Sequence, residues 1–195
     1  ISEVCFDSDV GYYVSGDLHL YSNTRYYGNG VKIKGNSTAY HIMRNHNIDG
    51  VGYDGDSNIT IEGFFFDMSN TDSDSVLGAI GIAHTTNTKI LNNTFVGRKS
   101  SANHTCDLVA NSNLIFSNNR IVECVANSNI QIDGAVSGSM PVTSTPYLNE
   151  DETRSKDILC NNNVFVDTSN CFHLHKNGHS NIRFIGNTAI DCIGE

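Results

Sequence analysis

Acidic, amide and imidazole side chains recur between apolar residues in the second half of the sequence. Asp107, Gln131 and His173 each stand between two apolar residues, and Asp133 and His175 follow Gln131 and His173 by two positions. Residues two apart in a β-strand share a face, so these polar side chains are expected together, opposite the apolar ones. Two carboxylates on one face can serve as a general acid and a general base, with an imidazole that orients one of them.

Asp107 and Asp133 are the predicted catalytic pair. If the strands that carry them stack in parallel, about 4.8 Å apart, their backbones are diagonal neighbours separated by about 8 Å. A carboxylate separation of about 6.5–9.5 Å leaves room for a water molecule between acid and base, as in inverting glycosidases. His175 would lie beside Asp133 as its orienting partner, and Gln131 and His173 would bind or polarise a sugar.

Asp54 is a further predicted substrate-binding residue. It falls in the same outward column as Asp133 if Val51 and Tyr53 are the inward residues of an earlier strand of the same kind. Its carboxylate would then extend the polar face on which the catalytic pair lies.

Tyr147 is predicted to bind substrate from a loop. It belongs to the segment 134–155, which contains both prolines of the chain and is longer than most loops that lack a function. A tyrosine ring can stack on the face of a sugar. A solvated loop that packs along the sheet or contacts another subunit is the alternative.

The same residues have two other interpretations. Outward Asp, Gln and His side chains are common on any solvated sheet. Asp133, His173 and His175 are also suitable metal ligands, but alternate residues on a flat sheet converge poorly on one ion. We therefore predict no metal and no other cofactor.

Short strands in an internal repeat must position these residues. An apolar residue is followed two positions later by Gly or Asn, and three positions later by Asn in five of six copies. The first apolar residues of the copies are Tyr26, Ile61, Ile90, Phe116, Cys160 and Phe184. The apolar residues five positions later are Val31, Phe66, Phe95, Ile121, Phe165 and Ala189. Such repetition indicates a solenoid, in which each coil buries its apolar face on its neighbours.

A second strand is predicted before each copy, with two inward residues. These pairs are Leu18 and Leu20, Val51 and Tyr53, Ile80 and Ile82, Cys106 and Leu108, Ile130 and Ile132, and Phe172 and Leu174. From Tyr53 onward they recur after 29, 26, 24 and 42 residues, and a loop of about 20 residues accounts for the last interval. The sequence therefore predicts one all-β domain over residues 1–195. It has about six coils, an Asn ladder, an irregular first part at 1–50 and a long loop at 134–155.

The coil length and the Asn ladder resemble the right-handed parallel β-helix of the pectate-lyase superfamily. The segments 129–135 and 156–163, joined by a loop with Pro and Tyr, are similar to β-helix proteins of Gram-positive phages and prophages. Those proteins belong to tail or baseplate assemblies, or to surface proteins related to pectate lyases. The resemblance implies engagement of a bacterial surface polysaccharide, a location in the virion or outside the cell, and assembly as a homotrimer or with other tail subunits.

This sequence lacks the motifs of the better-known enzymes of the superfamily. Those enzymes carry calcium-binding carboxylate clusters with a catalytic Arg or Lys, or paired aspartates in Asn-Thr-Asp and Asp-Asp motifs. Calcium and β-elimination are therefore not indicated, and hydrolysis of a polysaccharide is the favoured reaction. A non-catalytic receptor-binding or structural tail segment is the alternative from another class, and a polysaccharide lyase is the second alternative.

Composition narrows the range of partners. The net charge is -9 with only 12 Lys and Arg residues, which argues against nucleic acid. No run of 18 apolar residues is present, so no membrane-spanning helix is predicted. The six cysteines have no CxxC pair and no zinc-site spacing, and we expect buried free thiols. Because the sequence does not begin with Met, we also expect it to be part of a longer protein.

Overall fold

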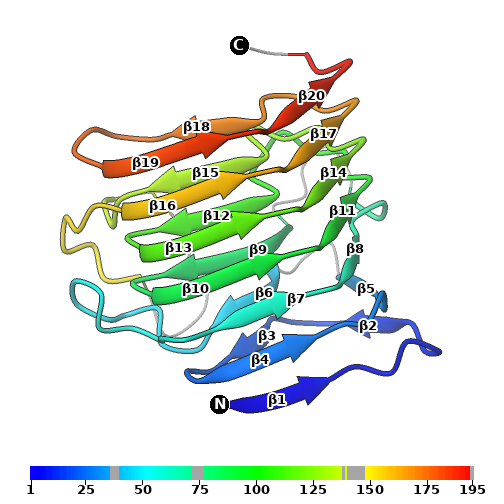
Figure 1. Ribbon diagram of the computed structural model, residues 1–195, viewed down its shortest axis with the longest axis horizontal. Helices are drawn as coiled ribbons and strands as arrows, with labels where there is room; N and C mark the ends of the chain where they lie inside the picture. Colours follow the sequence, from blue (N-terminus) through cyan, green and yellow to red (C-terminus); the bar gives the residue numbers. More distant parts are fainter. Residues whose placement is uncertain (36–39, 72–76, 138, 140–147, 194–195) are drawn as a thin grey trace.

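Three parallel sheets make up the chain. The computed structural model describes residues 1–35, 40–71, 77–137, 139 and 148–193. Among these residues every regular element is a β-strand (Figure 1). No helix long and apolar enough to cross a membrane occurs in the same part of the chain. The predicted all-β class is confirmed.

We name the sheets A, B and C. The strands of sheet A, in spatial order, are β1 (Ser2–Cys5), β4 (Thr24–Tyr27), β7 (Thr60–Glu62), β10 (Thr86–Leu91), β13 (Ser112–Ser117), β16 (Lys156–Asn161) and β19 (Ser180–Ile185). Those of sheet B are β2 (Tyr12–Val14), β5 (Lys32–Gly35), β8 (Phe65–Asp67), β11 (Thr94–Val96), β14 (Arg120–Val122), β17 (Val164–Val166) and β20 (Thr188–Ile190). Those of sheet C are β3 (Leu18–Leu20), β6 (His41–Asn45), β9 (Gly78–Ala83), β12 (Cys106–Val109), β15 (Ile130–Asp133) and β18 (Phe172–Leu174).

Successive strands pass from sheet A to sheet B to sheet C and then return to sheet A. Neighbours within a sheet are therefore three strands apart in the sequence and run parallel. Each group of three strands forms one coil that stacks on the previous coil, as in a parallel β-helix (Figure 1). In the described residues, six groups include all three sheets and a seventh includes strands of sheets A and B.

The register agrees with the predicted repeat in all copies after the first. Phe66 pairs with Phe95, and Phe95 pairs with Ile121. In the first copy the prediction is wrong, because Ile33 rather than Val31 pairs with Phe66. The bend between β4 and β5 is two residues longer than the bend between β7 and β8, so the sheet B strand begins later.

The second strand predicted around Val51 and Tyr53 is also wrong. β6 takes this place in sheet C, where Met43 pairs with Ile80, and Val51 is exposed in the connection between β6 and β7. All five residues of β6 are buried, so the strand lacks the alternation of apolar and polar residues. The segment 1–50, predicted as irregular, contains the six strands β1 to β6.

Apolar side chains from the three sheets fill the interior. The rings of Phe66 and Phe95 stack in parallel with centroids 5.0 Å apart, and Phe116 continues the stack at 6.2 Å from Phe95. Phe66 and Phe95 are equivalent positions of successive coils in sheet B, and Phe116 extends their stack from sheet A. All six cysteines are free; Cys106, Cys124 and Cys160 are buried, whereas Cys5 is exposed.

The predicted Asn ladder joins the coils at the bend from sheet A to sheet B. The backbone N–H of Asn93 donates to Oδ1 of Asn119 at 2.9 Å, and the same bond joins Asn119 to Asn163 and Asn163 to Asn187. Nδ2 of Asn119 also donates to the carbonyl of Ile90. The residue before each ladder Asn has a positive φ, which Asn and Gly tolerate best.

We expect Asn119→Ala to lower the free energy of unfolding by about 2–4 kcal/mol. The substitution leaves two buried backbone groups, the N–H of Asn93 and the carbonyl of Ile90, without their partner. Urea unfolding would measure the loss. The exposed Asn127 provides a control, because its replacement by Ala should change stability by less than about 0.5 kcal/mol.

Candidate active site

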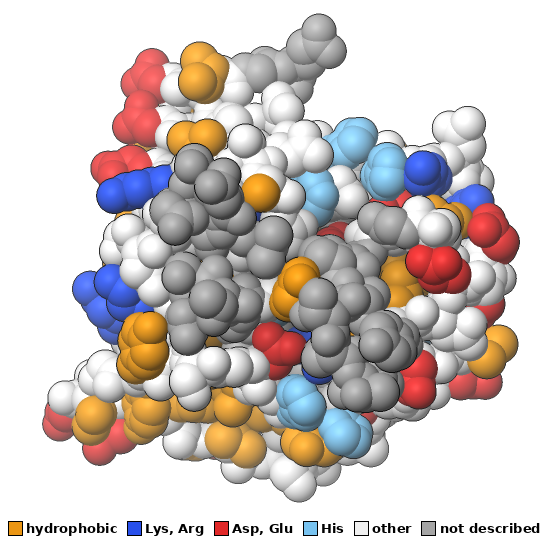
Figure 2. Space-filling model, turned by 180° about the vertical axis from the view of Figure 1, so that it is seen from behind, with side chains coloured by type: hydrophobic (Ala, Val, Ile, Leu, Met, Phe, Trp, Pro, Cys, Tyr) orange, Lys and Arg blue, Asp and Glu red, His pale blue; other side chains and the backbone are white. Residues whose placement is uncertain are grey.

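The outer face of sheet C carries the predicted catalytic residues. From β3 to β18, the outward residues that pair strand to strand are His19, Arg44, Gly81, Asp107, Gln131 and His173. Asp133 ends β15, and His175 follows β18 by one residue. All eight histidines lie in sheet C or in the connections that flank its strands. Figure 2 shows this face, with histidine side chains near both of its ends.

Asp133 is fully buried and accepts hydrogen bonds from three donors. These donors are Nδ1–H of His175 at 2.7 Å, the backbone N–H of Gly134 at 2.7 Å and the side-chain amide of Gln131 at 3.2 Å. The acceptor-only role suits a carboxylate. Because the amide nitrogen of Gln131 donates to Asp133, the amide oxygen of Gln131 accepts from Nδ1–H of His173 at 3.2 Å. The structure thus brings Asp133, Gln131, His173 and His175 together, as predicted from the sequence.

A further set of bonds fixes the backbone on which His175 lies. Nε2–H of His179 donates to the His175 carbonyl at 2.9 Å, and Nδ1 of His179 accepts from the backbone N–H of Ser155. The Ser155 hydroxyl donates to the Asp133 carbonyl at 2.7 Å. Asp133 and His175 are therefore held to each other through both side chain and backbone.

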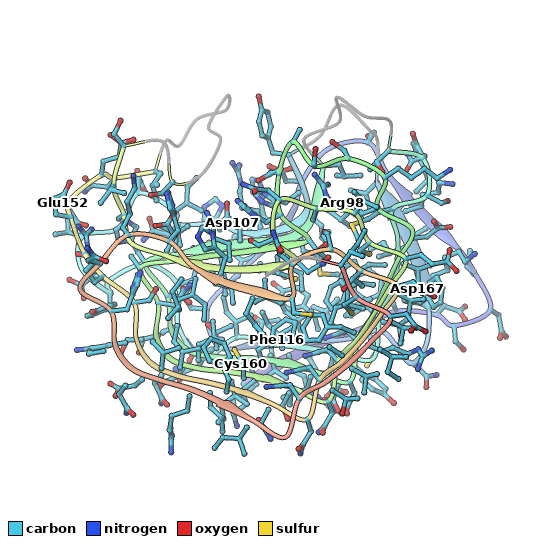
Figure 3. All side chains as sticks on the ribbon, turned by 90° about the horizontal axis from the view of Figure 1, so that it is seen from above. Arg98, Asp107, Phe116, Glu152, Cys160 and Asp167 are labelled. Carbon is cyan, nitrogen blue, oxygen red and sulfur yellow. The ribbon has the colours of Figure 1, made fainter. Side chains whose placement is uncertain are left out.

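Asp107 is also fully buried, but neither of its carboxyl oxygens has a hydrogen-bond partner among the residues that the structure describes. Figure 3 shows it on the outer side of sheet C, away from Phe116 and Cys160 in the interior. Burial, and secondarily the charge of Asp133, raise the pKa of Asp107 well above its usual range. A buried polar group without a partner costs roughly 1–3 kcal/mol. Such a cost is typical of residues retained for function rather than stability.

Three polar residues of this face were missed in the sequence. Arg44 Nε lies 3.1 Å from Asp17 Oδ2, with both side chains largely buried, and the ring of His41 is completely buried. One signal could have identified β6. Leu18 and Met43 pair at an interval of 25 residues, which matches the intervals of 26 and 24 residues between paired positions of β9, β12 and β15.

Two connections meet beside the carboxyl ends of the sheet C strands. His84 Nδ1 lies 2.8 Å from the Gly52 carbonyl, and its Nε2 lies 2.9 Å from the Asn149 carbonyl. The hydroxyl of Tyr53 donates to the carbonyl of Arg154 at 2.7 Å. Ile48, Ala83, Val109, Ala110, Ala135 and Leu148 form a small apolar cluster in the same region. The described part of the 134–155 segment is therefore attached to the sheet next to Asp133.

Two predicted substrate-binding residues are not part of this arrangement. Asp54 is exposed in the connection between β6 and β7, because Val51 and Tyr53 are not strand residues. The column position expected for Asp54 belongs instead to His46, one residue beyond β6. Tyr147 lies outside the residues that the structure describes.

The described residues include no group of three or more His, Cys, Asp or Glu side chains placed to hold a metal ion. What the face does offer is two adjacent carboxyl groups in different environments, with imidazole and amide groups around one of them. This arrangement can donate a proton from one carboxyl and accept a proton at the other.

Comparisons with known proteins add little to this description. No protein-family model matches the sequence, and no curated protein matches it. One similar solved structure is described as a "putative glycosyl hydrolase" from Parabacteroides merdae. It shares 15% sequence identity, the match covers 98% of this chain and 82% of that chain, and the TM-score is 0.35. A TM-score of this size carries no argument about fold or function, so the interpretation rests on the site itself.

Proposed function

We propose that the chain is a glycoside hydrolase that cleaves a bacterial surface polysaccharide, with Asp107 as the general acid and Asp133 as the general base. The contrast between these two neighbouring carboxyl groups is the main support. Asp107 is buried with no hydrogen-bond donor in the described part of the chain and has a raised pKa, whereas Asp133 accepts from three donors. Environments that favour opposite protonation states in adjacent carboxyl groups are typical of acid–base catalysis.

In the proposed reaction, protonated Asp107 donates its proton to the glycosidic oxygen as the bond to the anomeric carbon breaks. Asp133 accepts a proton from a water molecule that attacks this carbon from the opposite face. The two backbones are diagonal neighbours about 8 Å apart. If the carboxyl groups are separated by a similar distance, a water fits between them and the configuration is inverted. Exchange of protons with solvent then restores both carboxyl groups.

Gln131, His173 and His175 have two roles in this proposal. Their hydrogen bonds fix the orientation of the Asp133 carboxylate. His173 is exposed and the His175 side chain is 33% exposed, so both can also contact sugar hydroxyls. A base held in position in this way needs no reorganisation during the reaction.

A polysaccharide-binding segment without catalysis is the second candidate, and the burial of both carboxyl groups favours it. Asp107 and Asp133 have no exposed surface, so a sugar could bind at the exposed edge of His173 and His175 without reaching them. Under this second candidate, the chain is the right-handed β-helix of a phage tail protein. It assembles as a homotrimer or with other tail subunits, and it is located in the virion or outside the cell.

A screen of purified cell-wall and capsular polysaccharides from Gram-positive bacteria tests the proposal. Binding is followed by affinity electrophoresis, and cleavage is followed by the release of new reducing ends. We expect cleavage with saturated products whose anomeric configuration is inverted. Unsaturated products would indicate a lyase instead, binding without cleavage would favour the second candidate, and neither binding nor cleavage would contradict both.

A further inference from the structure

Within the described part of the chain, two completely buried polar side chains on the outer face of sheet C lack hydrogen-bond partners. Among these residues, neither ring nitrogen of His41 and neither carboxyl oxygen of Asp107 has a partner. Both residues have essentially no exposed surface. Buried polar groups are nearly always satisfied in native proteins, so two such groups on one face point to a partner outside the protein chain, either a ligand or a water.

Two glycines of β9 make room for the His41 ring. His41 pairs with Gly78, and Gly81 pairs with Asp107. A Cβ atom on Gly81 would collide with the imidazole, and a Cβ on Gly78 would come within 2.9 Å of its Cδ2. The ring of His41 therefore lies over β9, and Asp107 is on the next strand, about 4.8 Å further along the sheet.

The two groups offer the same kind of hydrogen bonding. Burial is the main reason that the pKa of His41 falls to about 3, with smaller contributions from the charges of Arg44, Arg98 and His104. A neutral imidazole has one N–H donor and one nitrogen acceptor, and a protonated carboxyl group has one O–H donor and an acceptor oxygen. A hydroxyl group, which both donates and accepts, can satisfy either of them.

We propose that His41 binds a hydroxyl group of the sugar ring whose glycosidic oxygen lies next to Asp107. His41 would thus be a substrate-binding residue, and Gly78 and Gly81 would be needed to seat it. The inference rests on the proposed function, because it takes the ligand of this face to be a polysaccharide. An ordered water molecule is the competing occupant, since a buried water also satisfies two such groups.

His41→Phe tests the inference, because it keeps a ring of similar size and removes both nitrogens. The probe is the wall or capsular polysaccharide that binds the unaltered chain in the screen. We expect its dissociation constant to rise about 3- to 10-fold, the effect of one lost hydrogen bond. His41→Gln, which restores a donor and an acceptor, should recover much of the affinity. His46→Phe, at an exposed histidine of the same face, should change it by less than twofold.

A second variant reaches the same contact without changing the imidazole. Gly81→Ala should displace the His41 ring and weaken binding to a similar extent. Thermal unfolding of each variant shows whether it is folded, and we expect His41→Phe to unfold at the same temperature as the unaltered chain or higher, since it removes unsatisfied groups.

The outcomes separate this inference from the proposed hydrolysis. Weaker binding by folded His41→Phe, in a protein that binds but does not cleave, would support the inference and contradict hydrolysis. Unchanged binding by both His41→Phe and His41→Gln, in a protein that cleaves, would mean that the site holds only water. If no polysaccharide in the screen binds, the inference is wrong together with the proposed function.

Discussion

Asp133→Asn is expected to lower kcat for polysaccharide cleavage by about 10²- to 10⁴-fold, while the polymer is still bound. The amide has nearly the shape of the carboxylate, and its oxygen can still accept from His175 and Gln131. Its NH₂ group takes the place of the oxygen that accepts from Gly134. It cannot accept a proton from the attacking water. The rate of appearance of new reducing ends measures the loss, and affinity electrophoresis on the same polymer measures binding.

Asp54→Asn is the matched control for this experiment. It makes the same chemical change at an exposed carboxylate in the connection between β6 and β7, and we expect less than a twofold change in rate. Equal rates for Asp133→Asn and the unaltered chain would remove Asp133 from the mechanism. The same result would favour a face that only binds the polysaccharide.

Asp107→Asn is expected to remove cleavage by a similar factor and at the same time to stabilise the protein. The amide cannot donate the proton that the leaving oxygen needs. It also has no charged form, so it escapes the cost of burying an ionised carboxylate. We expect its advantage in unfolding free energy to grow by up to about 1.4 kcal/mol for each unit of pH, from about pH 5 toward the raised pKa of Asp107.

The direction of this pH dependence follows from the raised pKa of Asp107. Above about pH 4 an unfolded chain has released the Asp107 proton while the folded chain keeps it. The contribution to stability is therefore full at low pH and is lost as the pH rises through the folded pKa. Burial lowers the pKa of His41 to about 3 and of His104 to about 4. Their contribution has the opposite direction and is lost as the pH falls below about 6.5.

Asp56→Asn is the control for the stability measurement. Asp56 is also buried, but its carboxylate accepts from the backbone N–H and hydroxyl of Ser22 and from the backbone N–H of Asn47. An amide group would face these donors with its own NH₂, and we expect a loss of about 1–3 kcal/mol. A loss of the same size for Asp107→Asn at every pH would show that Asp107 has partners in the folded protein and is not an acid held in its neutral form.

The sequence predicted the repeating parts of the fold from two independent marks that recur on most coils. In the copies that contain Phe66, Phe95 and Phe165, an inward apolar residue follows a bend marked by Gly or Asn. The ladder residues Asn93 and Asn163 stand at the same bend, so the register of sheets A and B could be read directly. The outward residues of sheet C could be predicted where they alternate strictly with inward apolar residues, as Gln131 does with Ile130 and Ile132.

Strand β6 and the difference between Asp107 and Asp133 could not be predicted from the sequence, because both depend on the surroundings of the outer face of sheet C. β6 is buried on both sides, so its polar residues Arg44 and His41 do not alternate with apolar ones in exposure. Only the interval of 25 residues from Leu18 to Met43 indicates that β6 belongs to the repeat. The contrast between Asp107 and Asp133 was also beyond the sequence, since it arises from the donors that reach one carboxyl and not the other.

A second row of asparagines joins the coils on the outside of the molecule. Asn23, Asn58, Asn87 and Asn113 bond to one another through their side chains at the start of the sheet A strands. Each has a positive φ. Each stands three residues before the first apolar residue of its copy of the repeat, so the same repeat aligns this row as well.

The stacking of coils also makes the length of the polar face independent of its chemistry. Each coil contacts mainly the coils before and after it, so stability is largely a sum over nearest neighbours. One additional coil between β3 and β6 would move His19 about 4.8 Å away from His41 and leave Asp107, Asp133 and His175 as they are. Under the proposed function, duplication of a single coil would therefore lengthen the face available to a polymer in fixed steps and leave the proposed catalytic residues unchanged.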